Sequence, residues 1–191
     1  MDNDETSNEA LETINGRKLN FRDGTYYKVN SENPFTGKIV FDEGWTVEEA
    51  NIKDGKRHGT ATYWSRDKKQ TSQLIYKQGE PWDGTLTEWN VLNRKSLEKN
   101  YQDGKRHGTH TSWHESGQKR WETNYKDGKR HGTSTEWNQN GSKYSEENYK
   151  DGKKHGAHTK WWYHNEKKEW EKNYKDGERH GTHTSWHESG A

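Results

Sequence analysis

The sequence has little of what normally builds a globular core. Among 191 residues it has no cysteine, two prolines and one methionine, and the hydrophobic residues together make up 23%. The lack of cysteine excludes disulfide bonds, zinc-finger frameworks and cysteine nucleophiles. The lack of aliphatic side chains excludes a thick core, because too little apolar surface is available to offset the conformational entropy lost on folding.

An excess of one charge and long apolar runs are also missing. Lys and Arg number 32 and Asp and Glu number 31, which gives a formal net charge of +1. A chain this close to neutral has no overall field that attracts nucleic acid, so we expect no nucleic-acid partner. No stretch approaches the ~20 apolar residues of a membrane span. Residues 1–10 are acidic and lack the basic start and apolar run of a signal peptide, so we expect a cytoplasmic protein.

Aromatic residues are abundant instead, and they recur at fixed places in a repeat. They make up 13% of the chain, with 11 Trp and 10 Tyr. The segment 125–132 reads Tyr-Lys-Asp-Gly-Lys-Arg-His-Gly, and close copies of it give units that start near residues 52, 76, 101, 125, 149 and 174. A fixed period of about 24 residues indicates an array in which each unit buries its apolar surface against its neighbours.

Each unit is predicted to form two short antiparallel strands. In segment 109–113, Thr109, Thr111 and Trp113 alternate with polar residues, and Trp121, Thr123 and Tyr125 alternate in segment 119–125. Such alternation is typical of half-buried strands. The recurring Asp-Gly pairs supply the positive φ angles of tight hairpin turns.

A two-residue turn at 127–128 places Tyr125 opposite Arg130. Unbroken alternation then puts Trp137 on the face away from Tyr125. A β-bulge near residues 131–132 would return both aromatic residues to one face, and we favour that arrangement.

The predicted fold is therefore all-β: an elongated single-layer antiparallel ribbon of tandem β-hairpin repeats of about 24 residues. Residues 1–16 are expected to be a disordered acidic tail and residues 17–51 a diverged capping unit. Residues 52–191 are expected to hold the tandem repeats, the last of them incomplete.

Several segments together resemble a known repeat family. These are Arg-Asp-Gly-Thr-Tyr-Tyr at 22–27, Pro-Phe-Thr-Gly-Lys at 34–38, the repeat core at 124–132 and Trp-Asn-Gln-Asn-Gly at 137–141. They resemble the MORN-variant (membrane occupation and recognition nexus) repeats of bacterial proteins, and more narrowly the YwqK-type antitoxin family, from residue 17 to residue 190. The resemblance implies a ribbon of stacked hairpins and an antitoxin that acts on a cognate toxin.

The aromatic rows are the first candidate for a binding surface. The plainer interpretation is that they form the packed face of the ribbon. A single layer, however, leaves such a face partly open, and exposed aromatic side chains rimmed by charge bind protein partners. The candidate partner-binding residues are Trp89, Trp113, Trp121, Trp137, Trp161, Trp162, Tyr163 and Trp170.

A basic turn in each unit is the second candidate. Successive turns at one edge lie ~10 Å apart, so their cations could meet an acidic partner or anionic lipid head groups. The plainer interpretation is a solubilising edge that prevents aggregation of sheets. The residues of this basic edge are Lys56, Arg57, His58, Lys105, Arg106, His107, Lys129, Arg130, His131, Lys153, Lys154 and His155.

The sequence gives no basis for a metal site, a cofactor or catalysis. The column that contains His110 does not persist between adjacent units, so its members do not converge on one ion. No phosphate-binding glycine loop, nucleophile elbow or His-Glu helix motif is present. We therefore expect a non-enzymatic chain without cofactor or metal.

The predicted function is a scaffold that binds a protein partner, and the family resemblance makes a toxin-masking antitoxin or immunity protein its most concrete form. Two alternatives stay open. The basic edge could bind anionic membrane lipid as a peripheral surface. The unpaired strand at the C-terminal end of the array could give self-association or a structural role.

Overall fold

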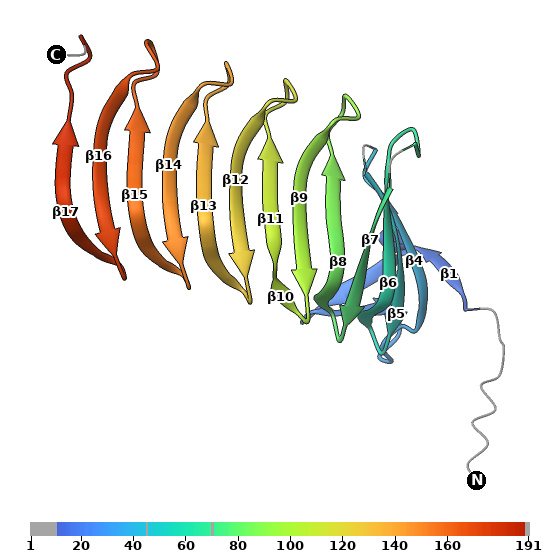
Figure 1. The fold of residues 1–191 in the computed structure, drawn as a ribbon. Coiled ribbons are helices and arrows are strands. Elements are labelled where there is room, and N and C mark those ends of the chain that lie inside the picture. The colour runs from blue at the N-terminus through green and yellow to red at the C-terminus, as the bar shows by residue number, and fades with distance from the viewer. Residues whose placement is uncertain (1–10, 45, 70, 190–191) are drawn as a thin grey trace.

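The chain is all-β, and its hairpins follow one another along a single ribbon (Figure 1). The computed structural model describes residues 11–44, 46–69 and 71–189. One sheet has 15 strands in nearly sequential order, and β2 and β3 form a separate two-stranded sheet. The strands before the regular array are β1 (Thr13–Asn15), β2 (Leu19–Arg22), β3 (Thr25–Lys28), β4 (Gly37–Asp42), β5 (Thr46–Lys53), β6 (Lys56–Ser65), β7 (Thr71–Lys77) and β8 (Glu80–Trp89).

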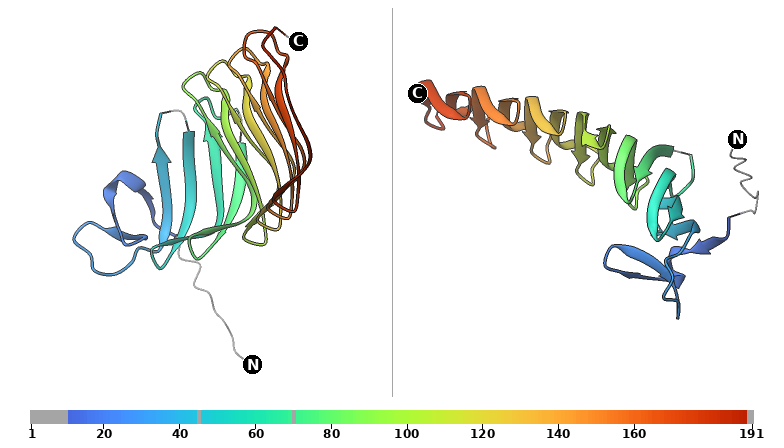
Figure 2. Two further views of the ribbon diagram at one scale, coloured as in Figure 1. Left: turned by 90° about the vertical axis from the view of Figure 1, so that its left-hand side faces the viewer. Right: turned by 90° about the horizontal axis from the view of Figure 1, so that it is seen from below.

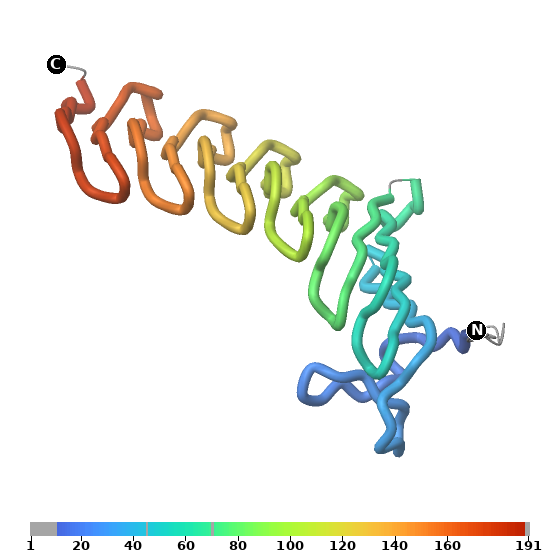
Figure 3. The backbone as a smooth tube through the Cα atoms, turned by 60° about the horizontal axis from the view of Figure 1, so that its bottom comes forward, coloured from blue at the N-terminus to red at the C-terminus, as the bar shows by residue number. Residues whose placement is uncertain are grey.

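The second half of the chain repeats one hairpin geometry. The strands of this half are β9 (Lys95–Gln102), β10 (Lys105–Arg106), β11 (Gly108–Trp113), β12 (Lys119–Lys126), β13 (Lys129–Trp137), β14 (Lys143–Lys150), β15 (Lys153–Trp161), β16 (Lys168–Lys175) and β17 (Glu178–Ser185). In Figures 2 and 3 these hairpins stand side by side as one bowed layer, with β17 at the end far from β1. The predicted elongated single-layer ribbon of antiparallel hairpins is confirmed.

Part of the segment expected to be a disordered tail is ordered. Residues 1–10 lie outside the described residues. Residues Thr13–Asn15, however, form β1, which pairs in parallel with β4, and the 3-10 helix η1 (Gly16–Lys18) follows it. The predicted boundary at residue 16 is therefore too late, because β1 pairs with the edge of β4 and its Ile14 packs against the hydrophobic core.

Hydrophobic burial is concentrated near the N-terminus. A cluster that includes Phe35, Ile39, Leu74 and Trp89 is almost fully buried. Beyond Trp89 the buried residues are polar, namely His110, Thr111, Ser112, Thr123, Thr135, Ser142, His158 and Thr159. The two largest of these side chains, His110 and His158, each pack between two tyrosine rings.

The Asp-Gly turns have the conformation that the sequence predicts. Asp127 and Gly128 have φ angles of 51° and 83°, as a type I′ hairpin turn requires. Tyr125 pairs with Arg130, also as predicted. Successive turns are linked, because the amide of Gly128 donates to the carbonyl of Arg106 at 2.9 Å and the amide of Gly152 donates to that of Arg130 at 2.8 Å.

The predicted bulge is present, but its effect on the aromatic face is the opposite of the prediction. Tyr125 pairs with Arg130 and Thr123 pairs with Ser134, so β13 holds two extra residues at this point. An insertion of two residues leaves the alternation of faces unchanged. Trp137 therefore lies on the face away from Tyr125, and the array has two different aromatic faces instead of one.

Among the described residues, no helix is both long enough and apolar enough to cross a membrane.

Candidate functional site

The two faces of the regular array carry different side chains. Residues that pair directly across strands share a face, and the registers place Ser112 with Trp121, His110 with Thr123 and Gly108 with Tyr125. We call this side the Tyr face. It carries Lys99, Tyr101, Arg106, His110, Trp121, Thr123, Tyr125, Arg130, Ser134, Glu136, Glu147, Tyr149, Lys154, His158, Trp170, Lys172 and Tyr174. The opposite side is the Trp face, with Trp113, Trp137, Trp161 and Trp186.

On the Trp face each indole ring is covered by a lysine of its neighbouring strand. The Nζ of Lys119 lies 5.6 Å from the centre of the Trp137 ring and forms an ion pair with Glu122 at 2.5 Å. A register shift between Ser112 and Trp113 brings Lys119 and Glu122 to the same face, although they are three residues apart. The same arrangement recurs with Lys95 at Trp113, Lys143 at Trp161 and Lys168 at Trp186.

We call this row of lysines over indole rings the lysine–tryptophan ladder, and it could have been recognised from the sequence. Each of these lysines precedes a glutamate by three residues, a spacing that shares a face only where a strand contains a bulge. The indole rings of the Trp face are half-buried, and the lysine over each ring is already paired with a glutamate. The charged groups of this face are therefore neutralised within the chain.

On the Tyr face, cations alternate with tyrosine rings along the turn edge. The guanidinium of Arg130 lies 5.1 Å from the centre of the Tyr149 ring and donates a hydrogen bond to its hydroxyl at 3.0 Å. Arg106 lies over Tyr125 in the same way, at 5.4 Å. Cation–π contacts of this kind contribute ~0.5–1 kcal/mol at exposed sites. The arginines of the basic edge therefore also stabilise the fold.

The three members of each basic turn separate in space. The arginine lies on the Tyr face, while the histidine turns to the next unit, where Nδ1 of His131 lies 3.4 Å from the carboxylate of Asp151. Lys105, Lys129 and Lys153 are exposed at the turns. Arg57 departs furthest from the predicted edge, because it is half-buried and forms an ion pair with Glu48 at 2.7 Å.

The eight aromatic candidates do not form one surface. Trp121 and Trp170 lie on the Tyr face, whereas Trp113, Trp137 and Trp161 lie on the Trp face under their lysines. Trp89 is only 2% exposed, so its ring is not available to a partner. Trp162 and Tyr163 lie in the loop after β15, where Tyr163 is exposed.

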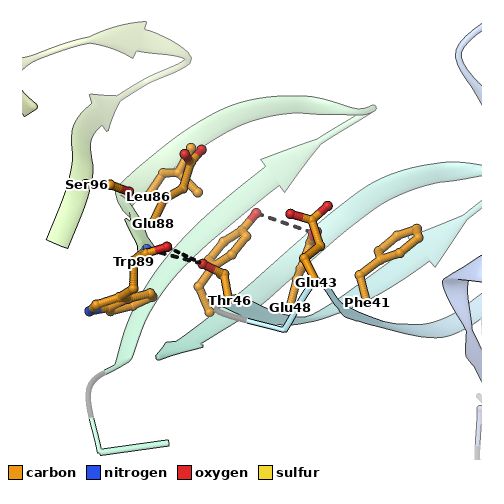
Figure 4. A pocket seen from close by; sticks show the side chains of 9 residues that line it. Phe41, Glu43, Thr46, Glu48, Leu86, Glu88, Trp89 and Ser96 are labelled. Atoms are coloured by element: carbon orange, nitrogen blue, oxygen red, sulfur yellow. Dashed lines mark hydrogen bonds between the residues drawn. The ribbon is translucent and has the colours of Figure 1, made fainter. Parts of the chain in front are cut away.

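Where the N-terminal strands meet the array, a small cavity contains three carboxylates (Figure 4). Glu48 there accepts hydrogen bonds from Arg57 at 2.7 Å and from the hydroxyl of Tyr63 at 3.4 Å. Burial, followed by the charge of Glu48, raises the pKa of Tyr63. Thr46 bridges to the backbone amide of Trp89 at 3.2 Å. This network joins β5, β6 and β8 and fixes the junction.

A hollow on the Tyr face spans β9 to β14 and combines cations, hydroxyls and one indole ring. Its lining comprises Lys99, Arg106, His110, Trp121, Thr123, Tyr125, Arg130, Ser134, Glu136 and Glu147. Burial, followed by the charges of Arg106 and Lys99, lowers the pKa of His110, although a hydrogen bond to Asn100 opposes this change. The part of the chain that the structure describes contains no group of three or more His, Asp or Glu residues placed to hold a metal ion.

No protein-family model matches the chain, and no curated protein is similar to it. The MORN-variant resemblance therefore stays a prediction.

Proposed function

We propose that this chain is a non-catalytic repeat scaffold that binds a protein partner along its Tyr face. The observation that carries the proposal is the difference between the two faces. The lysines of the Trp face cover its indoles and pair with glutamates. The hollow of the Tyr face instead contains the ring of Trp121 beside Lys99, Arg106 and Arg130, which form no ion pair within the part of the chain that the structure describes. Half-exposed aromatic and arginine side chains are the groups that most often anchor protein interfaces.

The finer form of the proposal, an antitoxin or immunity protein that masks a toxin, rests on the resemblance to the YwqK-type family. Surface complementarity along several repeats is sufficient for that role, since masking requires no chemistry from the scaffold.

The test is a tagged pull-down from the lysate of the native host at physiological salt, with the captured proteins identified by mass spectrometry. One stoichiometric protein is expected, and the double variant Trp121→Ala, Trp170→Ala should lose it. Tyr163→Ala, which removes an exposed aromatic ring from a loop instead of the Tyr face, is the matched control and should retain it. Capture that survives the double variant but not the control would contradict binding along the Tyr face.

A second candidate, peripheral binding to anionic lipid, is favoured by the exposed row of Lys105, Lys129 and Lys153. Flotation with phosphatidylserine vesicles tests it. Lipid binding should fall steeply with salt and disappear when these three lysines become Gln, whereas the Trp121 and Trp170 variants should leave it unchanged.

A further inference from the structure

The same register position on the Tyr face carries opposite charge in two units that otherwise match. His158 pairs across strands with Glu147, and its Nδ1 lies 3.5 Å from that carboxylate. Two units earlier His110 occupies the equivalent place. There Ser112 pairs with Leu97 and Thr111 with Glu98. The same register continued by one residue places Lys99 beside His110, and both residues line one hollow. A carboxylate in one unit is thus replaced by an ammonium in the other.

The unit with the carboxylate is neutralised internally. Glu147 contacts Lys154 at 3.4 Å and accepts a hydrogen bond from the hydroxyl of Tyr149. A hydrogen bond from His158, together with these contacts, lowers the pKa of Glu147 to about 2 despite its partial burial. Lys154, the cation that faces Glu147, is thus paired within the chain.

The unit with Lys99 lacks this neutralisation. Among the described residues, Lys99, Arg106 and Arg130 form no ion pair with a carboxylate; the two arginines instead bond tyrosine hydroxyls, at 3.4 and 3.0 Å. Two carboxylates also line the hollow, but Glu147 is engaged as described and only Glu136 is left without a cationic partner. The hollow therefore has an excess of positive charge that the chain does not balance.

The lining of this hollow includes aromatic rings. Trp121 lines it, and no lysine or arginine lies over its ring in the described part of the chain, whereas the equivalent Trp170 is covered by the Nζ of Lys172 at 4.1 Å. The hydroxyls of Thr123 and Ser134, 2.7 Å apart, lie beside it. An apolar plate next to fixed cations suits a carboxylate carried on methylene groups.

We propose that the hollow bounded by Lys99, Arg106, Trp121 and Arg130 binds glutamate side chains of an acidic segment of the partner protein. This inference rests on the proposed function and names the chemistry of its partner. Glu136 and Glu147 argue for a peptide over nucleic acid or lipid, because a peptide can present neutral residues to these carboxylates, whereas a phosphate backbone or a lipid surface repeats its negative charge.

The test measures binding of a fluorescein-labelled octapeptide in which glutamate alternates with glycine, by anisotropy at low salt, with the corresponding glutamine–glycine octapeptide as the uncharged comparison. Lys99→Glu reproduces the charge pattern of the unit with Glu147. Because the chain already carries a glutamate at the equivalent position, the fold should tolerate this change. Circular dichroism checks that the variant is folded. Lys150→Glu makes the same change of charge at an exposed turn position outside the hollow. We expect Lys99→Glu to weaken binding of the glutamate–glycine peptide at least tenfold and Lys150→Glu to weaken it less than twofold.

Three results would overturn the inference: no binding of the glutamate–glycine peptide at low salt, equal weakening by both variants, or tighter Lys99-dependent binding of oligothymidylate or of phosphatidylserine vesicles. Failure here remains distinguishable from failure of the scaffold. If the pull-down still yields a partner that depends on Trp121 and Trp170, the scaffold stands and only the acidic-segment chemistry falls.

Discussion

His110 and Tyr125 pack ring against ring, with centroids 4.6 Å apart and planes tilted by 44°. His158 and Tyr174 repeat this contact at 4.6 Å and 45°. In the unit between them Ser134 holds the equivalent position, where it pairs with Thr123. The histidine contact thus occurs in these two units and is absent from the one between them, so the Tyr face changes from unit to unit while the turns and the backbone repeat.

The His110 ring should contribute substantially to local stability. It is 1% exposed, it lies between Tyr101 and Tyr125, and its Nε2 is 2.7 Å from the carbonyl oxygen of Asn100. His110→Ala should lower the free energy of unfolding by about 2–4 kcal/mol, because it leaves a cavity and removes the hydrogen bond between the ring and the carbonyl of Asn100. Urea unfolding, with amide exchange in β11 and β12, measures this. His164→Ala, at an exposed loop position, should change it by less than ~0.5 kcal/mol.

The lysine–tryptophan ladder should be stabilising through its charge. Lys119→Met retains an apolar side chain of similar length but removes the ammonium from Trp137 and Glu122. The free energy of unfolding should fall by about 0.5–1 kcal/mol. Lys126→Met, at an exposed position near the turn, is the control. Equal effects of the two substitutions in thermal unfolding would show that the contact with Trp137 contributes nothing.

Two glycines with positive φ should differ sharply in their tolerance of alanine. A Cβ at Gly84 would lie 2.6 Å from the carbonyl oxygen of Gln73, whereas a Cβ at Gly108 meets nothing closer than Asn100 at 3.9 Å. Their φ angles are 108° and 69°. Gly108→Ala should cost about 1–2 kcal/mol from the left-handed conformation alone. Gly84→Ala should cost more, since the strands β7 and β8 must also move apart. Urea unfolding measures both variants, and similar midpoint concentrations of urea would contradict this prediction.

Glu147 should make the stability of the array depend on acidic pH. Its pKa is lowered to about 2 from an ordinary value of 4.5, so its ionised form stabilises the fold. That stabilisation is fully present above pH 4.5 and is lost as the pH falls through about 2. Glu147→Gln should therefore destabilise the protein more at pH 6 than at pH 2. Urea unfolding at both pH values tests this, and Glu115→Gln, in an exposed loop, should show no such difference.

Much of the fold follows from local chemistry that the sequence displays. Alternation in segments such as 119–125 marks the strands, and Asp127-Gly128 fixes a two-residue turn and hence the pairing of Tyr125 with Arg130. Less of the candidate site could be predicted from the sequence. The sequence identifies Trp121 and the basic turns as candidate residues. The prediction that Trp121 shares one face with the other tryptophans was wrong, because a bulge of one residue moves the following side chains to the other face and a bulge of two residues does not.

By itself, the sequence determined the repeat, the hairpins and the absence of a thick aliphatic core, because periodicity, turn residues and composition act through neighbouring residues. Only the tertiary structure decided which side chains meet. The pairing of Thr123 with Ser134 depends on the position of each hairpin relative to the next. Backbone hydrogen bonds between successive turns, such as that from the amide of Gly128 to the carbonyl of Arg106, fix this position. That register places Lys119 over Trp137 on one face and leaves Lys99, Arg106 and Trp121 together on the other.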